Sequence, residues 1–388
     1  MTCRMPKTTT SLSTPLREQL DRLAAFTPTP LPVLSLYLDL RPNEHGRREF
    51  DPFLRKAFAE RAAALQGDAR KSFERDVERI NSHLAEQLPK SATAAALFAC
   101  AAADDFFEAV HLDSRIEHHW LFIGSVPHLY PLARVNDQFP RYAALVVDTN
   151  SARVFVFSLG ASELVQQVTN VKTRGSMAGG WSQARYQRHL ENFHEQHLKE
   201  VADVLDRTVR EEAIDQIVLA CDAVTKPTLI AQLPKHLAEK IVDVVALDAG
   251  SPAHEIIRET MDVLRVHDAD NDVARVEKLI DAWQGSGLGV VGPDATLYAL
   301  SLGQVEELLI VAAAGELSHS QSLPMDTAPG AVDIETTAPA TGLDPDLVKL
   351  ADELVTRAQQ QSARIRFIED ASLLKDVGGV GAILRFKI

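Results

Sequence analysis

Apolar and polar positions alternate in blocks along the first third of the chain, and these blocks predict strands and helices in turn. An apolar run at 31–40 ends at the turn residues Arg41-Pro42-Asn43 and predicts a strand. At 50–88, charged residues alternate with Ala, Leu and Phe at helical spacing, and strand-like apolar runs return at 94–101 and 119–123. We therefore expect residues 1–140 to form an α/β domain.

The second section, 141–267, begins with three short strands and continues into one long helix. Turn residues separate the apolar runs at 142–148, 152–158 and 164–169, which predicts a β-meander. A glycine-containing loop at 173–180 leads into a helix of about 30 residues, which Ser182 is placed to cap. The helix is expected to bury Tyr186, Leu190, Phe193, His197, Val201 and Val204. Apolar runs at 216–221 and 241–247 then alternate with helices, which predicts a mixed sheet covered by helices.

The third section, 268–388, is expected to begin after a loop at 267–270. A helix, a strand at 290–291, a helix at 293–302 and a strand at 308–313 follow. The span 315–345 has four prolines, five acidic residues and no Lys or Arg, which predicts a disordered insertion. A helix near 347–361 and strands at 364–368 and 381–386 complete the section.

Composition narrows the class of protein. A chain of 388 residues is expected to hold two or three domains. The net charge of −14 argues against simple adhesion to nucleic acid, DNA included, or to an anionic membrane, so any RNA contact must be local. Cys3, Cys100 and Cys221 are far apart, which disfavours a disulfide framework and a zinc site. Without a leader peptide or an apolar stretch of about 18 residues, we expect a cytoplasmic protein that does not span a membrane.

Generic catalytic and cofactor motifs give no positive result. Residues 287–292 match GxGxxG, but a predicted helix precedes them and a strand follows, the reverse of the order that dinucleotide binding needs. His194 and His197 are three residues apart, which is not the spacing of HExxH, and a third ligand is not identifiable. A GxSxG elbow is absent. We therefore expect neither a cofactor nor a metal ion.

The most informative segment is RGSMAGGWSQARYQRHLENFHEQHLKEV at 174–201. Its glycines at 175, 179 and 180 make the loop sterically thin, as a backbone that approaches a ligand closely requires. Residues 171–200 carry five Lys or Arg against three Glu, so the sign of the charge is reversed locally. By itself the segment fits a surface loop ahead of an ordinary amphipathic helix equally well.

Three ordered matches resemble the archaeal and eukaryotic class I release factors and their relative Pelota. The meander, loop and long helix resemble the middle domain, in which a GGQ loop precedes a Ser and an Arg-aromatic pair. In the third section, VVGPDATLYALSLGQVEELLI at 290–310 is similar to the family's "AL..GAVE.LL" segment, and the end at 378–386 is similar to "GG.AAILRY". The third section carries more of the resemblance than the loop does. The matching positions are Gly179, Gly180, Ser182, Arg185 and Tyr186, then Gly303, Val305, Glu306, Leu308 and Leu309, then Gly378 to Phe386.

The resemblance implies three domains: an α/β N-terminal domain, a central RNase H-like mixed-sheet domain with a GGQ-like loop, and a C-terminal α/β/α sandwich. It also implies work in the ribosomal A site, in contact with ribosomal RNA and peptidyl-tRNA. A translational GTPase would be the partner of the C-terminal domain. The first section has neither the NIKS-type tetrapeptide nor the Tyr-Cys-Phe pattern needed to read a stop codon. We therefore expect a bacterial branch of the superfamily, related to the hibernation factor Balon, and not a codon-dependent terminator.

The loop departs from the family motif, because Trp181 stands at the third position and Gln183 follows two residues later. Two functions remain open. In ribosome rescue, Gly179, Gly180 and Gln183 would support hydrolysis of the peptidyl-tRNA ester. In hibernation, the protein would occupy the A site without chemistry; a paralogue with no ribosomal role is a third alternative. The residues expected to contact RNA are Lys172, Arg174, Trp181, Arg185 and Arg188.

Overall fold

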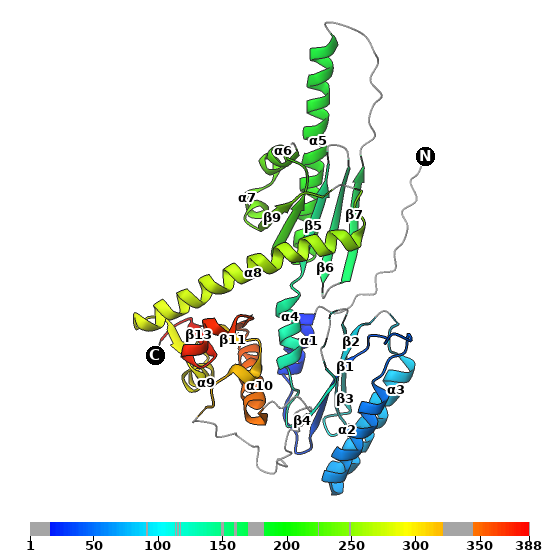
Figure 1. The fold of residues 1–388 in the computed structure, drawn as a ribbon, viewed down its shortest axis with the longest axis vertical. Helices are drawn as coiled ribbons and strands as arrows, with labels where there is room; N and C mark the ends of the chain where they lie inside the picture. Colours follow the sequence, from blue (N-terminus) through cyan, green and yellow to red (C-terminus); the bar gives the residue numbers. More distant parts are fainter. Residues whose placement is uncertain are drawn as a thin grey trace. The chain divides into compact units, whose positions relative to one another are not determined.

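The computed structural model describes residues 16–387 except 91, 113, 115, 117, 149–150, 159–160, 170–181, 224, 248–249 and 321–343. It divides into two compact units, which are considered separately. The first unit comprises Met1–Gln138 and Lys278–Ile388, and the second comprises Phe139–Glu277. Figure 1 labels the helices and strands. Within the described residues, the strands form three separate sheets. The predicted α/β class is confirmed, while the division into three domains stays a proposal.

The N-terminal sheet has the antiparallel order β3-β2-β1-β4. Its strands are β1 (Val33–Asp39), β2 (Ala94–Cys100), β3 (Phe106–Leu112) and β4 (Trp120–Gly124). Helices α2 (Asp51–Ala64) and α3 (Gly67–Glu86) pack on one face through Leu54, Phe58, Phe73 and Ile80. The charged helices expected at 50–88 are thus confirmed. Three elements were not predicted from the sequence: α1 (Leu16–Ala24), β3 and α4 (Tyr130–Gln138).

The carboxyl group of Asp76, on α3, is expected to make the stability of this sheet depend on pH. Asp76 is almost fully buried, and burial raises its pKa from 3.8 to about 7, against the smaller lowering by the Ala101 N–H, Arg75 and Arg79. A raised pKa in the folded state means that the folded chain binds the Asp76 proton more tightly than the unfolded chain does. The free energy of unfolding should therefore fall as pH rises from about 4 through 7. Asp76→Asn should remove most of that fall and stabilise the protein at pH 8 by on the order of 2 kcal/mol.

Denaturant unfolding at several pH values, with Asp68→Asn as the exposed control on the same helix, tests this effect of Asp76. A parent protein whose stability does not change between pH 5 and 8 would contradict it.

The second unit is a mixed sheet with helices on both faces, as predicted. Its order is β7-β6-β5-β8-β9, in which β5, β6 and β7 form the antiparallel meander and β5, β8 and β9 are parallel. The strands are β5 (Tyr142–Val147), β6 (Ser151–Ser158), β7 (Ala161–Thr169), β8 (Gln216–Ala220) and β9 (Ile241–Val245). One face packs against α5 (Ser182–Glu211), α6 (Thr225–Gln232) and α7 (Lys235–Ala238), and the other against α8 (Ala253–Gln284).

Helix α8 corrects one prediction, because the loop expected at 267–270 does not exist. A single helix of 32 residues continues through it. The stretch contains neither Gly nor Pro, and its aspartates cost only a few tenths of a kcal/mol each in a helix interior. Leu264 packs into the core of the second unit, and Leu279 is buried in the first. A boundary placed at 267/268 therefore falls inside a continuous helix.

The C-terminal sheet has the order β10-β13-β11-β12. Its strands are β10 (Gly289–Val291), β11 (Val305–Val311), β12 (Arg364–Ile368) and β13 (Val380–Leu384), with helices α9 (Pro293–Ser301) and α10 (Pro345–Gln360). The predicted order of elements around residues 287–292 is confirmed, because α8 precedes them and β10 lies within them. Of the predicted insertion 315–345, residue 315 lies in the 3-10 helix Ala314–Glu316 and Leu317 is buried, whereas 321–343 lie outside the described residues.

Candidate functional site

The candidate site lies between the end of β7 and the start of α5 in the second unit. Lys172, Arg174, Gly179, Gly180 and Trp181 fall at 170–181, outside the described residues. The neighbouring elements are described: β7 ends at Thr169, and α5 begins at Ser182. The structure therefore brackets the loop but does not test the roles predicted for these five residues.

The other candidate residues lie in the first two turns of α5. Gln183 is the second residue of the helix, and Arg185 and Arg188 follow within the next five. The helical backbone is described here, while the side chains up to residue 193 lie outside the described ones. The predicted long helix after the loop is thus confirmed. Its first backbone N–H groups have no carbonyl partner within the helix, which places partial positive charge beside the loop.

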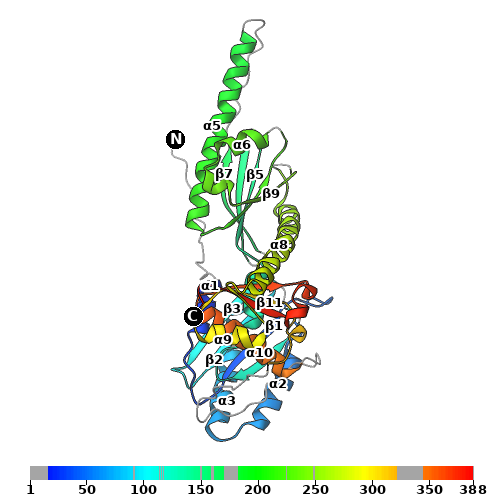
Figure 2. The ribbon, with the colours of Figure 1, turned by 90° about the vertical axis from the view of Figure 1, so that its left-hand side faces the viewer.

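Helix α5 is longer than the sheet on which it packs. Thirty residues span about 45 Å, whereas the six residues of β5 span roughly 20 Å. The buried residues of α5 within the described part begin at His197 and continue through Leu198, Val201 and Val204. In both Figure 1 and Figure 2 the first half of α5 projects beyond the sheet of its own unit. The loop is therefore attached to the tip of a projecting helix.

The base of α5 is anchored by burial and by charged contacts. The predicted burial of His197, Val201 and Val204 is confirmed, whereas the side chains of Tyr186, Leu190 and Phe193 lie outside the described ones. Desolvation lowers the pKa of His197 below its ordinary value, which favours the neutral ring. At the other end, Arg141 pairs with Glu212 just beyond the helix. Such a base holds the projecting half in a fixed direction relative to its sheet.

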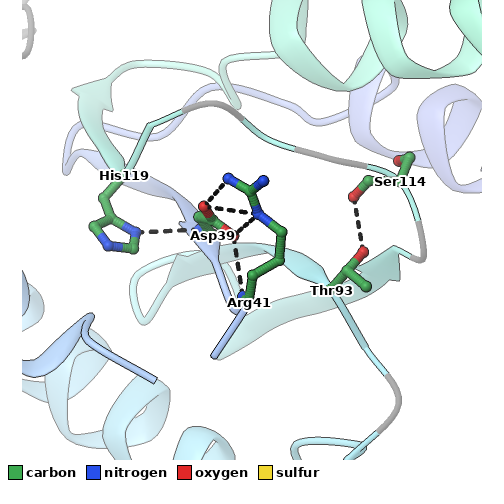
Figure 3. A network of polar contacts seen from close by, with 5 residues as sticks. All are labelled: Asp39, Arg41, Thr93, Ser114 and His119. Atoms are coloured by element: carbon green, nitrogen blue, oxygen red, sulfur yellow. Dashed lines mark hydrogen bonds and ion pairs between the residues drawn. The ribbon is translucent and has the colours of Figure 1, made fainter. Parts of the chain in front are cut away.

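A polar network in the N-terminal sheet was not found from the sequence. Arg41 binds both carboxylate oxygens of Asp39 at the end of β1, and the Asp39 N–H donates to His119 Nδ1 over 3.1 Å. The Thr93 hydroxyl donates to the Ser114 carbonyl over 3.0 Å, as Figure 3 shows. Burial raises the pKa of Asp39, but the Arg41 hydrogen bonds and charge outweigh it, and the pKa lies below its usual range. The Arg41 guanidinium is engaged by the Asp39 carboxylate at the end of the same strand. The contacts that join different strand ends are those of Asp39 with His119 and of Thr93 with Ser114.

Two histidines meet between α3 and β3. The Nε2 atoms of His83 and His111 are 3.1 Å apart, the rings are within 8° of parallel, and Gln87 Oε1 lies 3.1 Å from His83 Nδ1. Burial lowers the pKa of both rings. One shared N–H···N bond between neutral rings accounts for this geometry, so the pair fastens α3 to β3.

Two negative observations apply to the described residues alone. Among them, His, Cys, Asp and Glu do not gather into any group of three that could hold a metal ion. Within the same ranges, every helix is too short or too polar to cross a membrane.

Comparison with known proteins identifies a family model for the central segment and relatives that align over about two thirds of the chain. A family model described as bacterial archaeo-eukaryotic release factor family 10 matches residues 127–265, a range that contains the loop and α5. The eukaryotic peptide chain release factor subunit 1 of Oxytricha trifallax is 26% identical over 292 residues, which cover 69% of this chain and 66% of that protein. Peptide chain release factor subunit 1 of Pyrococcus abyssi is 25% identical over 293 residues, covering 67% and 69%. The alignments span about two thirds of the relatives' own lengths.

Solved structures of related factors also match. An archaeal translation termination factor, aRF1, has a TM-score of 0.26 and 16% identity, with 96% of this chain and 97% of that chain covered. Dom34 of S. cerevisiae, a translation termination-like factor, has a TM-score of 0.42 and 9% identity, with 76% and 80% covered.

Proposed function

Because the chain belongs to the superfamily of archaeal and eukaryotic class I release factors and Pelota, we propose that it is a ribosome-binding translation factor. It occupies the ribosomal A site and places its GGWSQ loop, Gly179 to Gln183, near the peptidyl-transferase centre. The observation that carries this proposal is the projecting half of α5, whose first residues, Ser182 and Gln183, are the end of the GGWSQ segment. Such an arm can extend a thin loop into a site that the bulk of the domain does not enter.

The chemistry of the arm suits RNA. The net charge of residues 171–200 is positive in a chain of −14, and the N–H groups of the first turn of α5, which have no carbonyl partner within the helix, favour a nearby phosphate. Trp181 adds a flat apolar surface on which a nucleotide base can stack. Lys172, Arg174, Arg185 and Arg188 are the cations that we assign to phosphate contacts. A translational GTPase is the partner that we propose for the C-terminal domain.

Peptidyl-tRNA hydrolysis is the second candidate function. Gly179, Gly180 and Gln183 lie within five residues, and because α5 begins at Ser182, Gln183 is the second residue of the helix. Backbone N–H groups can stabilise a developing oxyanion while a glutamine positions water. The helical backbone at Gln183 also restricts where its side chain can reach, which favours occupation of the A site over catalysis.

A release assay on stalled ribosomes that carry labelled peptidyl-tRNA separates the two functions. If the protein hydrolyses the ester, Gln183→Ala should lower the release rate roughly 100-fold or more, while Gln196→Ala, an exposed glutamine of the same helix, should not. If it only occupies the site, the parent should bind without releasing peptide. In both cases Trp181→Ala should weaken binding by about 10-fold, whereas Trp283→Ala, an exposed tryptophan elsewhere, should have no effect. Equal binding by the Trp181 variant and the parent would contradict the role given to the loop.

A further inference from the structure

Helix α4 joins the N-terminal and C-terminal sheets of the first unit through buried polar contacts. The segment that leads into it is bound to β1: the His128 N–H donates to Ser35 Oγ over 2.9 Å, and the Tyr37 hydroxyl donates to the His128 carbonyl over 2.5 Å. The His128 ring also lies against Phe122 of β4, with 3.6 Å between ring centroids. The start of α4 therefore belongs firmly to the N-terminal sheet.

The first turn of α4 is capped by a residue of the C-terminal part of the chain. Asp352, on α10, accepts hydrogen bonds through Oδ1 from the N–H groups of Leu129 at 2.7 Å and Tyr130 at 3.0 Å. Its other oxygen, Oδ2, lies 3.1 Å from His128 Nδ1. Helix caps ordinarily come from the residue just before the helix, whereas this carboxylate is 222 residues away in sequence. One largely buried side chain thus holds three donors of the N-terminal part.

The rest of α4 is bound to β11 and β12. The Tyr130 hydroxyl contacts the carbonyls of Ala312 at 2.9 Å and Val311 at 3.2 Å, and the ring lies edge-on to Phe367. At the other end, Asp137 accepts from the Phe367 N–H over 2.8 Å. Two strands of the C-terminal sheet are therefore bound to the same nine-residue helix.

These contacts differ from ordinary packing in being directional. Apolar faces can slide or repack at small cost, whereas a buried carboxylate that loses its donors leaves an unsatisfied charge. The polar contacts therefore specify a single arrangement of α4 against α10 and β12.

We propose that α4 is a latch that holds the N-terminal and C-terminal sheets as one mechanical body, and that Asp352 is the positioning residue that closes it. A partner that binds the C-terminal sheet then also fixes the N-terminal sheet. Loss of the Asp352 carboxylate releases α4 while each sheet keeps its own core. This inference does not depend on ribosome binding, because the latch is a property of the free chain.

Hydrogen–deuterium exchange of the free, full-length protein tests the latch. Asp352→Ala should speed exchange at the α4 amides and at Phe367 by roughly 10-fold or more, while α10 and β1 amides stay within about 2-fold of the parent. Tyr130→Phe, which breaks the contacts on the opposite side of α4, should open the same amides. Asp346→Asn, an exposed aspartate of α10, is the matched control.

Asp352→Asn, nearly identical in shape, covers the case in which the alanine variant does not fold. It should open the same α4 amides, because a neutral amide offers one acceptor oxygen where the carboxylate offers two, and it accepts more weakly. Unchanged exchange at α4 in both Asp352 variants would overturn the proposal. Equal opening of α10 itself would do the same, because Asp352 would then stabilise only its own helix.

Discussion

Gly379→Ala is expected to destabilise the C-terminal sheet by about 3 kcal/mol or more. Gly379 has a φ of +80°, a left-handed conformation that residues with a side chain adopt only at a cost. A Cβ atom there would also lie 2.8 Å from the Glu316 carbonyl oxygen and 3.2 Å from Leu317 Cα. Both neighbours include backbone atoms that cannot rotate away. The variant should show a lower midpoint in denaturant with an unchanged slope.

Gly303→Ala separates the backbone cost from the steric clash. Gly303 also has a positive φ, +68°, but no atom lies within 4 Å of a Cβ atom built there. This variant should therefore lose only the conformational part, roughly 1–2 kcal/mol. An equal loss in the free energy of unfolding for the two variants would contradict the close packing of Glu316 and Leu317 against Gly379.

Ala269→Pro is expected to have the second large effect, because it tests whether α8 is continuous. Ala269 is exposed and lies in the stretch where the sequence predicted a loop. In a helix interior, proline removes one hydrogen bond and clashes with the preceding turn, at a cost of about 3 kcal/mol or more. Ala269→Gly should cost only about 1 kcal/mol. Circular dichroism and amide exchange at 262–275 measure both changes. A proline variant indistinguishable from the parent would contradict a continuous α8 and support the loop that the sequence predicted.

The parts of the fold that could be predicted are those that depend on local periodicity. The meander and the helix that follows it have clear two-residue and helical repeats, and the structure has them at nearly the predicted residues. Strand β3 was missed because it is an edge strand, half-buried, with Glu108 and His111 among its apolar residues. The false loop at 267–270 came from reading a cluster of aspartates as a break, although aspartates are tolerated within a helix.

The contacts that could not be predicted join residues far apart in sequence. The three donors held by Asp352 and the Asp39–His119 contact have no local pattern, because each requires the sheets to be assembled first.

The segment that matches the family differs between the sequence motifs and the family model. The resemblance was carried mainly by the C-terminal section, whereas the family model matches residues 127–265, which include the loop. The departure at Trp181 thus lies within the matched region, and the part played by Trp181 and Gln183 stays a prediction.

Occupation of the A site is tested most directly by measuring how the labelled protein binds ribosomes that hold peptidyl-tRNA in the P site. We expect saturable binding that weakens as salt rises, because the proposed function assigns phosphate contacts to the cations of the arm. Filling the A site beforehand with aminoacyl-tRNA should abolish the binding. Failure to co-sediment with ribosomes at low salt, or binding that is undiminished when the A site is filled, would contradict the proposed function.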